Sequence, residues 1–120
     1  MTFQIDIEAL GVYCTYEGAS SMHEVLMAVE EIAAHPKVDC FRYVIHDCSR
    51  VGPVVLQDDS LTMVSAQSIG IAFSNTRLKG ALISTDAAIL QALAKYSKLT
   101  GRPVEVFGSE PAARAWAAGL

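Results

Sequence analysis

The residues best suited to chemistry stand together in the third hydrophobic segment of the chain, where His46, Asp47 and Cys48 are consecutive. On a strand, His46 and Cys48 face the same side, so they could form a cysteine–histidine dyad or supply two ligands to a metal ion. A dyad needs hydrogen-bond contact, whereas residues two apart on a strand lie about 6.5 Å apart. A metal ion needs further ligands, and the sequence contains no second histidine–cysteine cluster. The pattern therefore favours ordinary residues at the end of a strand.

No motif of a known enzyme class can be placed elsewhere in the sequence. Neither phosphate-binding glycine motif is present, and no GxSxG, HExxH or CxxC pattern occurs. Asp58 and Asp59 form an acidic pair, but their position before a helical pattern is typical of a helix cap. The sequence therefore predicts a protein without enzymatic activity, cofactor or metal site.

The densest polar cluster contains Asn75, Arg77 and Lys79 and lies between a predicted helix and a predicted strand. Two cations and an amide at this place could bind an anion or a carboxylate. Alternatively, Asn75 ends the helix and the two basic side chains lie on an exposed strand edge. We favour the second interpretation and keep the first as an alternative.

The composition excludes several classes of function. The chain has 120 residues, an apolar share of 52% and a net charge of −4. This acidic balance argues against nucleic-acid binding, because the neutralisation of phosphates needs a basic face. No signal peptide or membrane-spanning stretch is visible, and the three cysteines have no disulfide-framework spacing. We therefore expect one cytoplasmic domain over residues 1–120.

Hydrophobic periodicity predicts the elements that must position these residues. Strands are expected over residues 3–8, 12–17, 41–48, 78–84 and 104–107, with a break at Gly52-Pro53. Helices are expected from the capping box at 21–24 to residue 35, from 58–60 to about 73, from 86 to 99 and from 109 to about 118. The first two strands should form an antiparallel hairpin, and the alternation that follows implies a largely parallel sheet. Val29 and Ile83 are central in strong apolar patterns, so we expect both in the core.

The segment from Ser60 to Thr76 contains no charged residue. A helix whose outer face is polar but uncharged is unusual at a fully solvated surface. Either other helices cover it, or it meets a partner subunit or an apolar ligand. We expect this face, with Ser68 on it, to favour self-association, most simply as a two-fold homodimer.

Three stretches of the chain together resemble a known family. They are FRYVIHDCSRV, FSNTRLKGALISTD and RPVEVFGSEPAARAWA. The combination is similar to the SpoIIAA-like family, also called STAS/SEC14-like, whose members are small bacterial domains related to anti-sigma-factor antagonists. The resemblance implies an α/β fold, a single-domain STAS-type βαβ superhelix with a mixed sheet of about five strands and about four helices. It also implies a regulatory domain that docks a protein partner or a second copy of itself.

The antagonists of this family carry a phosphorylatable serine at the start of the helix that follows an Asp-x-Ser strand end. Asp47 and Ser49 match that strand end, and Ser60 is the position to which the switch serine would carry over. The glycine of the Asp-Ser-x-Gly-Leu setting is absent here, and the connection before the helix is longer. We therefore expect Ser60 to act mainly as a helix cap and the domain to bind its partner constitutively.

A second function from a different class stays open. The domain could carry or sense a small apolar or anionic ligand held between the second helix and the sheet. Met63 and Phe73 would line that space, and Arg77 would lie at its mouth. A structure that shows whether the second helix packs shut or flanks a cavity discriminates between the two functions.

Overall fold

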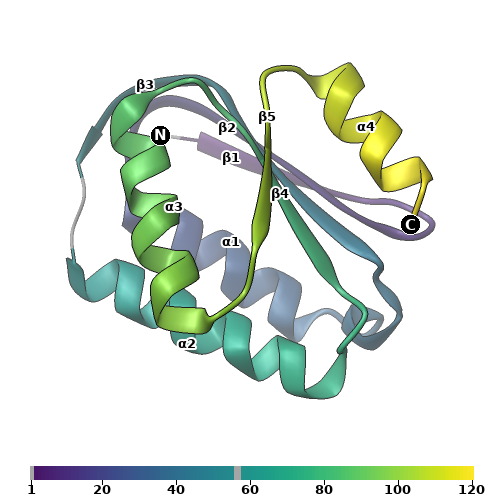
Figure 1. The fold of residues 1–120 in the computed structure, drawn as a ribbon. Helices are drawn as coiled ribbons and strands as arrows, with labels where there is room; N and C mark the ends of the chain where they lie inside the picture. The colour runs from purple at the N-terminus through teal and green to yellow at the C-terminus, as the bar shows by residue number, and fades with distance from the viewer. Residues whose placement is uncertain (1, 56–57) are drawn as a thin grey trace.

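The computed structural model describes residues 2–55 and 58–120, whose strands form one sheet with α-helices packed on both of its faces (Figure 1). In chain order the elements are β1 (Thr2–Ile7), β2 (Gly11–Ser21), α1 (Met22–Ala34), β3 (Tyr43–Val55), α2 (Asp58–Ser74), β4 (Lys79–Ile83), α3 (Ala87–Thr100), β5 (Val104–Phe107) and α4 (Glu110–Ala118). A short 3₁₀ helix, Val38–Cys40, joins α1 to β3. The predicted strands and helices are confirmed, and only β2 and β3 run well beyond their expected ends.

The sheet has the strand order β1-β2-β3-β4-β5. β1 and β2 form the predicted antiparallel hairpin, and each of the later neighbours pairs in parallel. The parallel pairs need crossover connections, which α1, α2 and α3 supply. The sheet is therefore mixed and largely parallel, as the sequence predicts.

β3 continues as a strand through Gly52-Pro53, where the sequence predicts a break. It pairs in parallel with β2 as far as Ser21 and Val55, and at two places β3 carries one extra residue. The second extra residue falls at Gly52-Pro53. Proline lacks a backbone N–H, but it is tolerated here because a bulge leaves a residue unpaired and because β4 accompanies β3 only as far as Asp47.

The helix ends follow the predicted capping chemistry. The Glu24 carboxylate accepts the backbone N–H of Ser21 at 3.2 Å, which is one half of the expected capping box. The Asp86 carboxylate accepts two backbone N–H groups at the start of α3, at 2.9 and 3.1 Å. α3 ends at Gly101, whose φ of 67° lies in the left-handed region that favours glycine.

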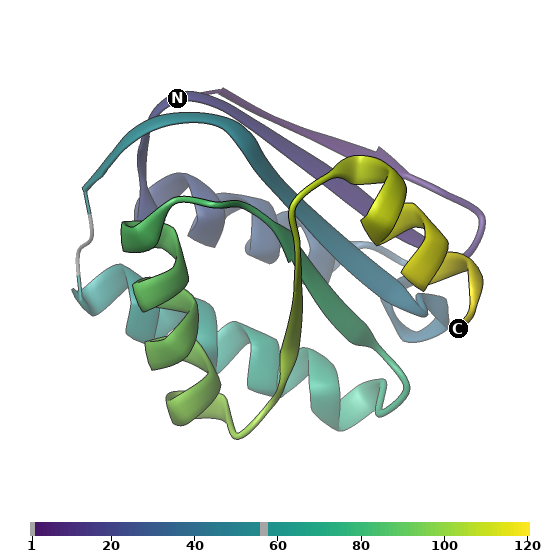
Figure 2. The same cartoon turned by 45° about the horizontal axis from the view of Figure 1, so that its top comes forward.

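Helices α1, α2 and α3 cover one face of the sheet, and α4 covers part of the other (Figures 1 and 2). The larger core cluster joins β2 and β3 to α1 and α2, and the smaller one joins the middle of the sheet to α4. Val29 lies in the first cluster and Ile83 in the second, and both are buried as predicted. Among the described residues, no helix is long and apolar enough to cross a membrane.

Ile83→Ala should destabilise the domain by about 2–5 kcal/mol, because Ile83 is 1% exposed on a central strand and its loss leaves a cavity. Urea unfolding at neutral pH measures the change. Val106→Ala on the adjacent edge strand β5 is the control, and it should cost less than about 1 kcal/mol because Val106 is exposed. A cost below about 0.5 kcal/mol for Ile83→Ala would show that β4 is not central to the core.

Candidate functional site

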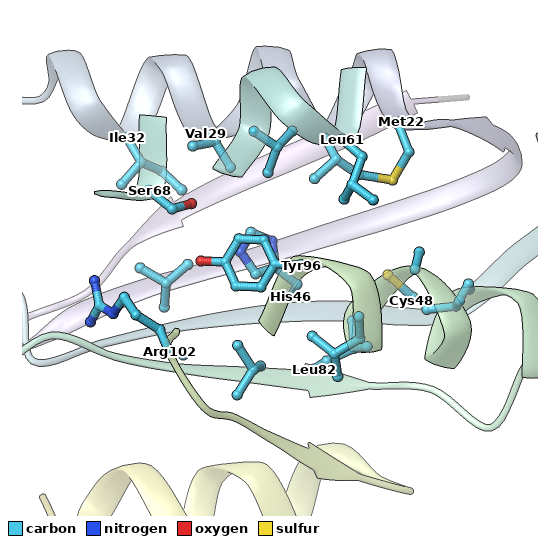
Figure 3. Close-up of a pocket in the computed structure, with 18 of the residues that line it drawn as sticks. Met22, Val29, Ile32, His46, Cys48, Leu61, Ser68, Leu82, Tyr96 and Arg102 are labelled. Atoms are coloured by element: carbon cyan, nitrogen blue, oxygen red, sulfur yellow. The ribbon is translucent and has the colours of Figure 1, made fainter. Parts of the chain in front are cut away.

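A cavity of about 170 Å³ lies between the sheet and the three helices α1, α2 and α3 (Figure 3). Its helical wall is largely apolar, with the hydroxyl groups of Ser68 and Tyr96 as exceptions, and it includes Val29 and Ile32 from α1, Leu61 and Val64 from α2, and Ile89 and Leu93 from α3. An apolar cavity of about 150 Å³ is large enough to bind benzene. Helix α2 therefore flanks a cavity rather than packing shut, and the space is sized for a small ring.

The sheet contributes polar side chains to this cavity through the parallel register of β2 and β3. Cys14 pairs with His46 in that register, so Tyr16, two residues further on, lies beside His46 on the same face. Figure 3 shows His46 between the labelled residues of α1 and α2 and Leu82 of β4, overlapped in this view by Tyr96 of α3, with Arg102 toward one end and Cys48 toward the other. The cavity is thus apolar at its walls and polar at a few separate points.

The Tyr16 hydroxyl and the His46 ring form the principal polar contact in the cavity wall. The hydroxyl oxygen lies 2.9 Å from His46 Nδ1, and the two rings stack with their centroids 5.9 Å apart. Burial lowers the pKa of His46 to about 4, because the charged imidazolium would lose its hydration. His46 is therefore neutral at physiological pH, and it is an interior residue of β3 rather than one at the end of a strand.

Cys48 faces the same cavity as His46, as the alternation on a strand predicts. Burial raises the pKa of the Cys48 thiol to about 12, so the nucleophilic thiolate is not populated at neutral pH. The described residues contain no group of three or more His, Cys, Asp or Glu side chains that could hold a metal ion. The Cys48 thiol is therefore not activated as a nucleophile at neutral pH.

The structure does not place the predicted lining residues Met63, Phe73 and Arg77 on the cavity. All three are exposed, because they lie on the outer side of α2 or just beyond its end, and that part of the prediction is wrong. The basic residues that border the cavity are Lys79 and Arg102. The Arg102 guanidinium donates a hydrogen bond to the Leu78 carbonyl at 2.7 Å. Sequence spacing alone could not place Arg102 here, since it follows α3 rather than α2.

The exposed apolar side chains of α2 form a separate feature, which we call the α2 outer face. It consists of Met63, Ala66, Ile69 and Phe73. Spacings of three and four residues place these side chains along one side of the helix. Ser68, expected on this face, instead lines the cavity. That expectation is wrong because α2 is apolar on both sides, so its sequence does not reveal which side turns inward.

Asp47 and Ser49 lie together, but away from the cavity. Asp47 is buried on the sheet face that packs against α4, where it accepts hydrogen bonds from the Tyr13 hydroxyl at 2.5 Å and the Ser49 hydroxyl at 2.6 Å. Burial alone would raise the pKa of Asp47, but these hydrogen bonds and one from the Ser49 backbone N–H outweigh it and hold the pKa below its ordinary value. In this structure Asp47 is buried and is held by internal hydrogen bonds, whereas Ser49 is exposed.

Ser60 is neither exposed nor in a capping position. Helix α2 begins at Asp58, so Ser60 is its third residue and is 8% exposed. The cap position before Asp58 lies outside the described residues. The expectation that Ser60 caps the helix is therefore wrong, and the exposure that a phosphorylation switch requires is absent at this position.

Asn75 serves the packing of the chain rather than an exposed polar site. Its side-chain amide donates hydrogen bonds to the carbonyls of Val38 and Phe41 at 3.0 and 2.7 Å, and its oxygen accepts the Arg77 N–H at 3.2 Å. Because Asn75 is buried and satisfied, it cannot act with Arg77 and Lys79 as an anion site. The structure favours the alternative in which Asn75 ends the helix.

Solved structures with a similar fold include the following three. One is the anti-sigma factor antagonist SpoIIAA in its unphosphorylated form, with 15% identity, a TM-score of 0.63, and coverage of 99% of this chain and 100% of that one. Another is an anti-sigma factor antagonist from Mycobacterium paratuberculosis, with 14% identity, a TM-score of 0.61, and coverage of 98% and 93%. The third is an uncharacterized protein from Shewanella loihica PV-4, with 14% identity, a TM-score of 0.55, and coverage of 96% and 93%.

These likenesses establish that the chain has a SpoIIAA-like fold, as the family resemblance implies. The third structure is itself described as having that fold. No family model and no curated relative matches the sequence. At 14–15% identity, the comparisons bear on the arrangement of the elements and not on the residues of the cavity.

The wild-type domain should be about 2 kcal/mol less stable at pH 5 than at pH 7 through His46 alone. Its ordinary pKa is 6.5 and its folded pKa is about 4, so acid protonates the unfolded chain first. This contribution to stability is complete above about pH 6.5 and is lost as the pH falls toward 4. Urea unfolding at pH 7, 6 and 5 measures it. His46→Leu should lose this dependence, whereas His23→Leu, at an exposed position on α1, is the control. If the unfolding free energies of wild type and His46→Leu changed with pH in the same way, the lowered pKa of His46 would be contradicted.

Proposed function

We propose that the chain is a non-enzymatic regulatory domain that acts by binding another protein molecule, and that the α2 outer face is its contact surface. The observation that supports this surface most strongly is the Phe73 side chain, which is 85% exposed. Met63 and Ile69 on the same face are also exposed. Contiguous exposed apolar side chains mark interaction sites, because their burial against a partner removes apolar surface from water.

A second copy of the chain is the partner that the charge pattern favours. The net charge of −4 makes two copies repel one another over most of their surfaces. No charged residue occurs between Ser60 and Thr76, so the α2 outer faces can meet without placing like charges together. The likeness to anti-sigma-factor antagonists supports a regulatory role for this pairing. We place the domain in the cytoplasm, where free thiols such as its three cysteines persist.

Phe73→Arg should shift the wild-type dimer toward monomer without changing the folding of the protomer, because the new charge would be desolvated within the contact. Multi-angle light scattering across a range of protein concentrations measures the mass, and circular dichroism checks the fold. Leu99→Arg is the matched control, since it changes an exposed apolar residue on α3 and should leave the dimer intact. A wild type that stays monomeric at high concentration would overturn the proposed pairing.

The binding is constitutive in this proposal, and no phosphate on Ser60 regulates it. A kinase needs access to the hydroxyl group, and Ser60 is buried within the first turn of α2. Mass spectrometry of protein isolated from its native cells should therefore find Ser60 unmodified. Stoichiometric phosphate at this position would show that the helix start opens and that the domain works by phospho-switching.

A second candidate function is the binding of a small apolar ligand, and the cavity of about 170 Å³ is the observation that favours it. The space lies between the sheet and α1, α2 and α3, and its walls are largely apolar, which is the usual character of a small-molecule site. This candidate is compatible with the first one. α2 lines the cavity with its inner side and presents Phe73 and its neighbours on its outer side.

A further inference from the structure

The polar atom that bears most directly on the cavity's ligand is Nε2 of His46. Among the described residues, the hydrogen bond to the His46 ring is the one between the Tyr16 hydroxyl and Nδ1, so Nε2 has no partner within this part of the chain. No fully buried side-chain nitrogen or oxygen of the described residues lacks a hydrogen-bond partner. Because Nε2 has no such partner, it must keep some accessible surface, and the space beside the ring is the cavity (Figure 3).

The contact with Tyr16 determines what Nε2 offers. A phenolic hydroxyl is the stronger donor of the pair and a neutral imidazole nitrogen the stronger acceptor, so we assign the Tyr16 O–H to donate to Nδ1. That assignment places the ring hydrogen on Nε2, since the hydrogen bond made by one ring nitrogen sets the state of the other. A hydrogen-bond donor then faces an apolar space, and a ligand oxygen could satisfy it.

The surroundings of this donor limit the charge and size of the ligand. His46 is neutral because burial lowers its pKa to about 4, so the ring gives no ionic compensation to an anion. Arg102 borders the cavity toward one end, apart from His46 (Figure 3), where its guanidinium donates a hydrogen bond to the Leu78 carbonyl. A charged group placed at His46, within the apolar walls, would lose its hydration without an ionic partner beside it. The volume of about 170 Å³ suits one small ring or a branched chain of similar size.

We propose that the cavity binds a small uncharged molecule with a ring-sized apolar body and one hydroxyl or carbonyl oxygen, which accepts a hydrogen bond from His46 Nε2. Tyr16 acts as a positioning residue that holds the imidazole in the required tautomer. This proposal rests on the ligand-binding candidate above and specifies the ligand's chemical class. The same site discriminates against isosteric hydrocarbons, because they leave Nε2 unpaired.

Phenol and toluene are suitable probes because they have the same size and differ by a hydroxyl in place of a methyl group. NMR titration of the full chain, followed at the methyl groups of Val64 and Leu93, gives a dissociation constant for each. We expect wild type to bind phenol at least as tightly as toluene. His46→Leu should weaken phenol about tenfold and change toluene less than about threefold, because the phenol hydroxyl is then buried without a partner. His23→Leu changes an exposed histidine outside the cavity and is the control that should change neither.

The possible outcomes separate the two levels of the proposal. If neither phenol nor toluene binds wild type, the ligand-binding candidate itself fails. If toluene binds but His46→Leu weakens phenol and toluene equally, the cavity stands and the role of Nε2 is overturned. Benzoate provides the charge test, and binding of benzoate that is tighter than that of phenol would overturn the uncharged class in favour of an anion held by Arg102.

The ¹⁵N resonances of the His46 ring provide a test in the unaltered protein, which holds even if His46→Leu fails to fold. In wild type, Nε2 should carry the ring hydrogen. The Nε2 resonance should shift when phenol is added and should stay unchanged when toluene is added. Tyr16→Phe should reduce that response, because the tautomer is no longer fixed. A ring hydrogen on Nδ1, or an Nε2 resonance that phenol does not move, would contradict the proposal.

Discussion

The alternation of side chains along β3 is the constraint on which the rest of this structure depends. β3 lies in the middle of the sheet, so both of its faces are covered and each successive residue must suit a different environment. Val44 packs in the cluster beneath α1 and α2, whereas Ile45 packs in the cluster beneath α4. The next two residues continue the pattern, with His46 on the cavity side and Asp47 on the α4 side. Two polar neighbours in the sequence thus serve unrelated purposes on opposite faces.

On the cavity side, the polar pair of Tyr16 and His46 gives a physical reason why the space stays open. One ring nitrogen is satisfied within the protein, and the other faces the cavity. If apolar side chains closed the space, they would bury that nitrogen without a partner, at a cost of about 1–3 kcal/mol. Helix α2 can cover the cavity without filling it, because its inner residues Leu61 and Val64 contact the space while its outer residues remain exposed.

On the α4 side, charged and hydroxyl groups join parts of the chain that are far apart in sequence. The Arg114 guanidinium contacts the Glu8 carboxylate at 2.6 Å, and the Tyr43 hydroxyl donates to the same carboxylate at 2.5 Å. Arg114 also lies over the Tyr13 ring, 4.2 Å from its centroid, and Tyr13 in turn donates to Asp47. Burial would raise the pKa of Glu8, but the hydrogen bonds from Arg114 and Tyr43 outweigh it and keep the pKa low. This chain of contacts fastens α4 to the β1–β2 turn and holds Asp47 inside the molecule.

The sequence alone determined the local elements, because their signals are local. The capping box at Ser21, the cap at Asp86 and the left-handed glycine at position 101 each act through neighbouring backbone groups, and apolar periodicity identified the central strands. The extension of β3 through Gly52-Pro53 was not predictable in this way, because a partner strand and a bulge, rather than the proline itself, decide it. The inward side of α2 was equally hidden, since both of its sides are apolar. Only the tertiary structure brought Tyr16 to His46, removed Met63 and Phe73 from the cavity, and placed Arg102 beside it. Those positions depend on strand register and helix packing, which join residues too distant in the chain for any spacing rule to connect.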